Sequence, residues 1–281
     1  MDSGSNIAAE LPMSKGFGHS YVLPIAKSAS SKATEKRRYL TIKIKLMLKL
    51  HNSVFVRHAG LWMVGLMLLA FVGFWQSYFS QLFTAEGGFN GYFHFHAAMA
   101  TLWIIILITQ PILIRTKRYK LHRRIGTIAH VVLALFFLSV ILLTHHQLSS
   151  AESIRYISAF IPCRDLVIVG VAYTIAMRYQ HIIGIHARGM IATGIAFIEP
   201  SLIRAIGAVF PDLDNKYLWT IGITYMIIIL LMIIGRKHKP GRWVFPLILG
   251  IYIVAHTIIV MRLPLGFFED AVDWFVSLPL T

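Results

Sequence analysis

Long apolar runs, separated by short polar stretches, fill the chain from residue 58 to residue 263. Each run is close to the roughly 20 residues that an α-helix needs to cross the hydrocarbon layer of a membrane. The seven runs cover residues 58–79, 93–115, 124–146, 158–179, 187–209, 217–235 and 243–263. The pattern predicts an all-α, polytopic membrane protein, in which residues 58–263 form a bundle of seven transmembrane helices.

The two ends of the chain have a different pattern. Residues 1–57 are basic and largely polar, and their N-terminal part holds too little apolar surface to offset the entropy of ordering, which predicts a flexible cytoplasmic tail. Within it, residues 39–50 mix lysine with leucine, isoleucine and methionine, which fits either an interfacial segment or an ordinary basic flank of the first span. Residues 264–281 combine aromatic with acidic side chains and predict an amphipathic helix on the outer surface.

Composition and charge agree with this architecture and add an orientation. Of all residues, 57% are hydrophobic and only 14% are charged, which is typical of membrane proteins. The loops after the second, fourth and sixth runs hold twelve lysines and arginines, whereas the opposite loops hold only Arg155 and Lys216. Because basic residues stay on the cytoplasmic side, we expect a cytoplasmic N-terminus and a periplasmic C-terminus. The net charge of +15 then indicates contact with an anionic cytoplasmic leaflet of the lipid bilayer, and not with nucleic acid.

Cysteine chemistry contributes little. Cys163 is the single cysteine, which excludes an internal disulfide and any multi-cysteine zinc or iron–sulfur site. The chain also lacks a nucleophile elbow, a phosphate-binding loop and a Cys-x-x-Cys motif. Histidine, carboxylate and arginine side chains therefore carry the candidate chemistry.

Glu199 is the acidic residue placed deepest inside a predicted span. At about 1.5 Å per residue it lies about 18 Å from the cytoplasmic start of the fifth span, where an acidic group costs a few kcal/mol unless it faces protein or water. Ionisable groups of other spans reach a similar depth in the outer half of the membrane. We predict one polar cluster made of His96, His145, Glu199, Arg204 and His256. The structural alternative ties Glu199 to Arg204, to Arg164 or to a tyrosine, and makes Arg164 and Asp165 an interhelical pair or headgroup contacts.

Histidines near the outer face are also candidate ligands, because imidazole nitrogen binds iron and copper well. The candidate metal or haem ligands are His94, His96, His145, His146 and His256. On the second span His96, Trp103 and Gln110 are spaced by seven and share one helical face. A second site near the cytoplasmic face would use His122, His130 and His186, for which contact with lipid phosphate or with a neighbouring helix is the alternative.

Several of these residues form a recurring pattern. The pattern reads His94-x-His96, Trp103, Gln110, Leu121-His122-Arg123-Arg124-x-Gly126 and His186-x-Arg188-x-Met190, followed by Glu199-Pro200. It resembles a family of uncharacterised bacterial inner-membrane proteins, with Ala97 and Ala187 in place of the usual glycine and lysine. The resemblance covers roughly residues 90–205. It implies a multi-pass protein of the bacterial inner (cell) membrane, and it implies no specific activity.

Three functions stay open at this point. The histidines favour a metal- or haem-dependent membrane redox protein, with haem, iron or copper as cofactor. Glu199, His256 and Arg204 instead fit the relay or substrate site of a proton-coupled small-molecule carrier. A non-catalytic accessory or assembly protein is the third. Each version of the outer site depends on His96, Glu199 and His256 facing one chamber.

Overall fold

The computed structural model describes most of the chain, namely residues 34–39, 41, 59–84, 90–149, 155–237 and 239–281. The chain divides into two units, residues 1–49 and 50–281. The described residues of the first unit are helical and exposed. Most of the predicted tail at 1–57, and of its segment 39–50, lies outside the described residues.

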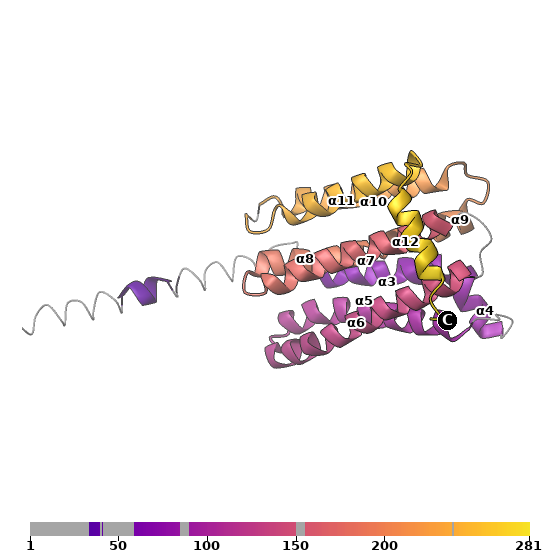
Figure 1. The fold of residues 1–281 in the computed structure, drawn as a ribbon. Helices are drawn as coiled ribbons and strands as arrows, with labels where there is room; N and C mark the ends of the chain where they lie inside the picture. Colours follow the sequence, from indigo (N-terminus) through magenta and orange to yellow (C-terminus); the bar gives the residue numbers. More distant parts are fainter. Residues whose placement is uncertain (1–33, 40, 42–58, 85–89, 150–154, 238) are drawn as a thin grey trace, which may run out of the picture. The chain divides into compact units, whose positions relative to one another are not determined.

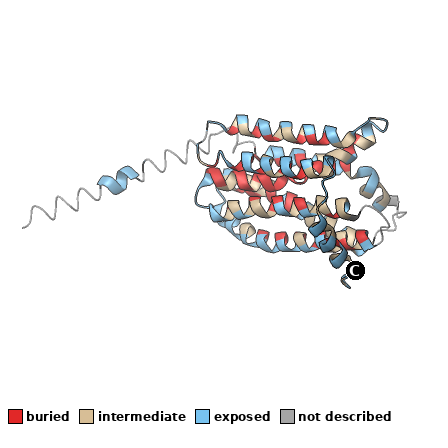
Figure 2. Ribbon diagram, turned by 45° about the horizontal axis from the view of Figure 1, so that its top comes forward, coloured by how far each residue is buried: buried red, intermediate tan, exposed pale blue. Residues whose placement is uncertain are grey.

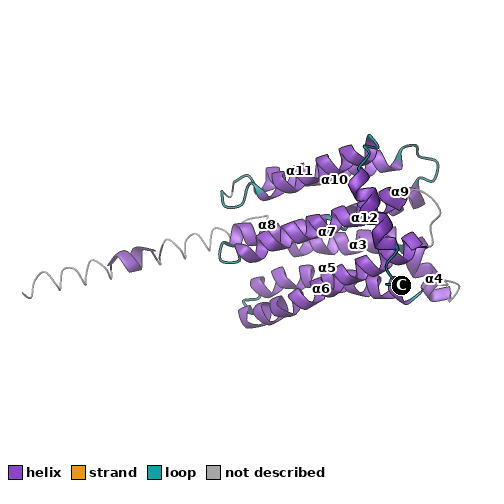
Figure 3. Cartoon of the chain, viewed as in Figure 1, coloured by secondary structure: helices purple, strands orange, loops and turns teal. Residues whose placement is uncertain are grey.

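Every regular element in the described part of the second unit is a helix, so the all-α prediction is confirmed there (Figure 1; Figure 3). In chain order they are α3 (Ala59–Gly73), the π-helix η1 (Trp75–Phe79), α4 (Ser80–Thr84), α5 (Gly91–Arg115), α6 (Tyr119–Ser149), α7 (Arg155–Arg178), α8 (Ile183–Ile195), α9 (Ile198–Val209), α10 (Lys216–Gly235), α11 (Val244–Val260) and α12 (Gly266–Val276).

Five stretches of these described residues are long and apolar enough to cross a membrane: α5, α6, α7, α8 together with α9, and α10. A bent pair, Ala59–Gly73 with Trp75–Leu82, makes a sixth. Helix α11 is apolar but has only 17 residues. The structure thus has the character of a multi-pass membrane bundle with five or six spans. The seventh span and the orientation stay predictions.

The first predicted span, 58–79, is not one straight helix. Its two halves meet at an angle of 55°. The bend follows Gly73, where α3 crosses α9 so closely that a Cβ atom would lie 2.1 Å from the carbonyl oxygen of Ser201. Only glycine allows this backbone approach, as is common where membrane helices pack tightly.

Helices α8 and α9 form the centre of the bundle. In their most apolar window 72% of the residues are buried inside the protein, against 28–33% in the other four spans, and Figure 2 shows the exposed residues gathered on the outward faces of the outer helices. The two helices are separated by a turn at Ala196 and Phe197. Pro200 explains the turn, because its ring displaces the carbonyl group four residues earlier, that of Ala196. The interruption places Glu199 in the first turn of α9.

Helix α12 lies within the predicted amphipathic segment 264–281. Its buried Val272 packs against Leu148 of α6 and Ala159 of α7. In Figure 1 this helix, drawn in yellow, crosses the ends of the longer helices. It closes the end of the bundle to which the predicted topology assigns the periplasm.

Candidate functional site: a buried arginine–glutamate–histidine cluster

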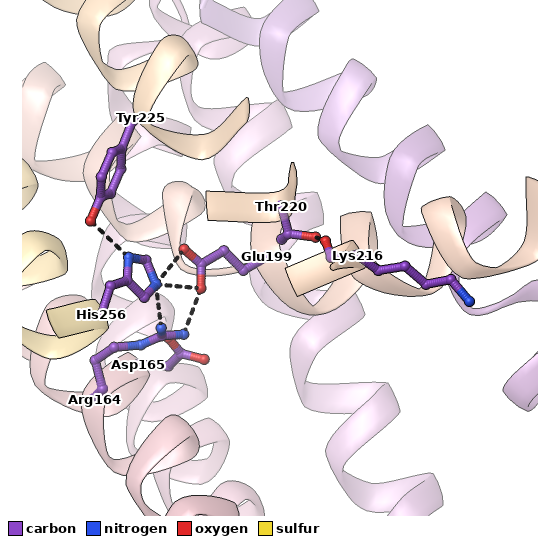
Figure 4. A network of polar contacts seen from close by, with 7 residues as sticks. All are labelled: Arg164, Asp165, Glu199, Lys216, Thr220, Tyr225 and His256. Atoms are coloured by element: carbon purple, nitrogen blue, oxygen red, sulfur yellow. Dashed lines mark hydrogen bonds and ion pairs between the residues drawn. The ribbon is translucent and has the colours of Figure 1, made fainter. Parts of the chain in front are cut away.

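Three ionisable side chains from three helices meet inside the bundle. Arg164 of α7 places its Nη2 atom 2.8 Å from Oε2 of Glu199 in α9. His256 of α11 places its Nε2 atom 3.1 Å from Oε1 of the same glutamate. The three side chains are only 2–5% exposed. Figure 4 shows them pointing toward one another from separate helices.

The sequence places these residues at a common level in the bundle. Arg164 lies nine residues after the start of α7, and Glu199 lies ten residues before the end of α9. At about 1.5 Å per residue both are therefore about 15 Å from the same end of the bundle. A charged group at that depth in hydrocarbon needs a protein partner, and here each supplies the other.

Arg164 also holds a second carboxylate. Its Nε and Nη2 atoms donate to Oδ1 of Asp165, at 3.0 and 2.8 Å. One guanidinium group thus faces two carboxylates. With His256 neutral, the four side chains carry one excess negative charge, and one further proton would make them neutral.

Lys216 does not provide the missing positive charge. Its side chain points away from the cluster in Figure 4, and its Nζ atom donates to the carbonyl oxygen of Pro211. Thr220 is joined only to the backbone of Lys216, through a hydrogen bond of 2.9 Å.

The Nε2 atom of His256 has two competing partners. It lies 2.8 Å from Nη1 of Arg164, and because a guanidinium group only donates, Nε2 must accept there without a proton. It also lies 3.3 Å from Oε2 of Glu199 in hydrogen-bonding geometry, and an ionised carboxylate requires Nε2 to donate a proton. Oε1 is closer, at 3.1 Å, but it has no hydrogen-bond partner among the described residues. The Nε2 atom therefore lies between a donor and an acceptor that require opposite protonation of that nitrogen.

The other ring nitrogen is compatible with both states. Nδ1 of His256 lies 3.0 Å from the hydroxyl group of Tyr225, to which it donates when Nε2 is unprotonated and also when both nitrogens carry protons. A proton added at Nε2 thus replaces the hydrogen bond from Arg164 by one to Glu199, while the hydrogen bond between Nδ1 and Tyr225 is kept.

Tyrosines surround the cluster. The ring centroids of Tyr217, Tyr225 and Tyr252 lie 5.9, 5.5 and 5.5 Å from that of His256. The guanidinium carbon of Arg164 is 5.4 Å from the centre of the Tyr252 ring. The Tyr217 hydroxyl group lies close to Arg164, and the buried hydroxyl group of Tyr252 makes no hydrogen bond within the described part of the chain; each of the two is available to a further polar partner. Such groups almost always bind a partner in native proteins, so both can serve a polar ligand or water here.

Of the predicted outer cluster, the structure joins Glu199 with His256 and gives the other three residues different partners. Nδ1 of His96 lies 3.3 Å from the Ser139 hydroxyl group. Nδ1 of His145 lies 2.7 Å from Oγ1 of Thr281, beyond helix α12. Arg204 donates to the carbonyl of Pro200 at 2.7 Å, and its guanidinium carbon lies 4.5 Å from the centre of the Phe74 ring.

The tentative metal or haem ligands are likewise dispersed. His94 lies 2.8 Å from the hydroxyl group of Tyr78, and the ring of His146 is 5.4 Å from that of Tyr92. Across the described residues, no three His, Cys, Asp or Glu side chains form a group that could hold a metal ion. The described side chains therefore show no three-ligand metal site, and haem binding stays a prediction.

The histidines of the predicted cytoplasmic-face site make backbone contacts. Nδ1 of His130 lies 2.9 Å from the carbonyl oxygen of Gly126, one turn earlier in α6. Nδ1 of His186 lies 2.9 Å from that of Ala176 and so joins α8 to α7. The carbonyl of His122 accepts from Nε2 of Gln110 at 3.2 Å. The contact of Gln110 ties α5 to α6 and that of His186 ties α7 to α8, whereas the contact of His130 lies within α6.

Arg164, Asp165 and the tyrosines Tyr217, Tyr225 and Tyr252 are the residues of the cluster that the sequence did not single out as functional. Arg164 had the clearest signal, because it is an ionisable residue inside an apolar run, and such residues usually mark a functional or paired site. Its neighbour Asp165 suggested a self-contained pair. The tyrosines had no signal, since membrane helices contain many.

Comparisons with known proteins add no relative. No family model, no curated protein and no solved structure matches this chain. The resemblance to the inner-membrane family stays a prediction, and the functional argument rests on the geometry of the cluster.

Proposed function

We propose that this protein is a proton-coupled carrier of a small organic or inorganic anion, located in the bacterial inner membrane. The observation that carries the proposal is the position of His256 Nε2, within hydrogen-bonding distance of both Arg164 and Glu199. A single proton decides which of the two it binds.

Arg164 is the anion-binding group in this scheme. A guanidinium fork recognises carboxylate and phosphate groups through parallel hydrogen bonds. Its partners within the protein, Asp165 and Glu199, are carboxylates. An anionic substrate would therefore compete with these two carboxylates for the same guanidinium N–H groups. The hydroxyl groups of Tyr217 and Tyr252 would donate to the same anion.

Proton binding couples to anion binding through charge and hydrogen bonds. When Nε2 of His256 takes up a proton, it becomes a donor to Glu199 and is repelled by the positive charge of Arg164. Nη1 of Arg164 then lacks its acceptor and is available to the anion. One proton and one monovalent anion together leave the net charge of the buried site unchanged.

This geometry favours the carrier over the other two functions. A redox centre needs nitrogen ligands that converge on one metal or haem, and the outer histidines contact separate partners. An accessory protein needs only a stable bundle and gives no reason for three ionisable groups to compete for one proton in the interior.

Transport by the reconstituted protein tests the proposal. Proteoliposomes containing a pH-sensitive dye would be given an inward proton gradient with radiolabelled succinate or inorganic phosphate outside. We expect proton entry linked to uptake of at least one anion, lost in Glu199→Gln and Arg164→Gln and retained in Arg204→Gln. Uptake of neither probe, or wild-type uptake by Glu199→Gln, would overturn the proposal.

Infrared difference spectroscopy tests the proton-binding step without a substrate. A protonated buried carboxyl group has a distinct carbonyl stretching band. We expect such a band to appear as the pH falls, to disappear in Glu199→Gln and to shift in His256→Gln. Identical spectra for the wild type and Glu199→Gln would show that Glu199 takes no part in proton binding.

A further inference from the structure

A second polar site lies at the other end of the bundle. Residues of α8, α10 and α11, with Arg236 and Arg242 from between α10 and α11, line a half-open cavity of about 410 Å³. Its lining consists of Arg188, Met232, Gly235, Arg236, Arg242 and Phe245. The volume lies in the usual range of small-molecule sites, and half of the lining residues are arginines.

Arg188 is a rigid, buried part of this cavity. The residue is only 2% exposed to solvent. Nη1 donates to the carbonyl oxygens of Gly184 and Pro240, at 3.1 and 2.6 Å, and Nη2 donates to that of Gly235, at 2.8 Å. These three acceptors are uncharged. They hold the guanidinium group at the wall of the cavity.

Arg236 and Arg242 form the exposed rim. The guanidinium group of Arg242 donates to the backbone carbonyl of Arg236, so the loop folds back on itself and keeps both side chains beside the cavity. No lining residue is acidic, and residues 216–261 contain no aspartate or glutamate. The three arginines therefore give the described lining of the cavity a positive charge that attracts an anion.

Aromatic residues place the cavity at the level of the lipid headgroups. The rings of Tyr179 and Trp243 meet edge to face with centroids 6.1 Å apart, and both side chains are exposed. Trp243 directly follows Arg242. Exposed tyrosine and tryptophan side chains are typical of the membrane–water interface, and the abundance of basic residues predicts that this is the cytoplasmic interface.

We infer that the arginine cavity, defined by its six lining residues, binds a phosphate group, namely that of an anionic lipid headgroup of the cytoplasmic leaflet or of a soluble phosphate ester. Arginine recognises phosphate through paired, charge-assisted hydrogen bonds. Basic pockets between membrane helices on this side are suited to anionic headgroups. The half-buried Met232 supplies an apolar surface beside the arginines, which favours the lipid. The inference is independent of the proposed carrier function.

Native mass spectrometry of the full-length protein in detergent tests the inference. Phosphatidylglycerol and phosphatidylcholine would be added separately to the wild type, to Arg236→Gln/Arg242→Gln, and to the control Arg118→Gln/Arg123→Gln. The control removes the same charge from two exposed positions near the α5–α6 connection, Arg118 in the connecting turn and Arg123 near the start of α6. Arg188 is retained in all three, because its hydrogen bonds hold the loop.

We expect the wild type and the control to bind phosphatidylglycerol in preference to phosphatidylcholine. The rim variant should bind phosphatidylglycerol about tenfold more weakly for each arginine removed, which corresponds to one charge-assisted hydrogen-bonding group each. Equal weakening in the control and the rim variant, or equal binding of the two lipids by the wild type, would overturn the lipid as ligand.

A soluble competitor separates the two sources of phosphate. Glycerol 1-phosphate would be titrated into the wild type and the rim variant by calorimetry in the absence of added lipid. Binding that the rim variant loses, without a preference for phosphatidylglycerol, would assign the cavity to a soluble phosphate ester. Failure of both glycerol 1-phosphate and phosphatidylglycerol to bind selectively to the wild type would refute the phosphate site altogether.

Discussion

Replacing Arg164 by glutamine should destabilise the protein far more than replacing Glu199 by glutamine. Arg164→Gln leaves the carboxylates of Asp165 and Glu199 without their shared cation, whereas Glu199→Gln leaves Arg164 paired with Asp165 at 2.8 Å. The side chains of Arg164 and Glu199 are 2% and 5% exposed, so water cannot replace the lost partner.

The magnitudes follow from this asymmetry. Removing one partner of a buried ion pair costs about 3–5 kcal/mol, which we expect for Arg164→Gln. Glu199→Gln loses a charge but keeps a hydrogen-bond acceptor, so we expect a loss of about 1–2 kcal/mol. Because the two side chains touch, the double variant should be less destabilised than the sum of the single variants, by about 1–3 kcal/mol.

Unfolding in mixed micelles by increasing amounts of sodium dodecyl sulfate, followed by tryptophan fluorescence, would give the free energy of unfolding of each variant. Arg204→Gln is the matched control, because Arg204 is exposed and contacts a carbonyl group and the Phe74 ring. It should lose less than about 1 kcal/mol. If Arg164→Gln does not fold, Arg164→Lys keeps the charge without the fork and should fall between the wild type and Glu199→Gln. Equal losses in the two glutamine variants, adding in full in the double variant, would refute the shared buried ion pair.

Three further predictions test the packing, the topology and the redox alternative. Gly73→Ala should cost more than about 2 kcal/mol in the same unfolding assay, because its Cβ atom would overlap the Ser201 carbonyl oxygen, whereas Gly222→Ala, with no atom within 4 Å of the added carbon, should be neutral or stabilising. Alkaline phosphatase fused after Thr281 should be active in a bacterial host and green fluorescent protein at the same position dark; the reverse result would invert the predicted orientation. A histidine-ligated cofactor would give a visible absorption band that changes when dithionite is added. This band should be lost in His96→Ala and kept in His122→Ala. A colourless preparation from metal-replete cells that contains no iron or copper would exclude such a cofactor.

Much of the fold was predictable from residue order alone. The apolar runs located the helices from α5 to α11. A helix that crosses the hydrocarbon layer needs a minimum number of consecutive apolar residues, and that number can be counted in the sequence. The amphipathic segment at the C-terminal end corresponds to α12 for a similar reason. The bend after Gly73 was not predictable, because it depends on how closely α9 approaches α3.

The site divides in the same way. Depth along a helix follows from counting residues, so the sequence by itself brought Glu199 and His256 to a common level in the membrane. The direction in which each side chain points depends on the rotation of its helix, and the packing of neighbouring helices decides that rotation. Tertiary structure alone therefore turned Arg164 toward Glu199, left His96 beside Ser139, and made one histidine nitrogen the shared partner of an arginine and a glutamate.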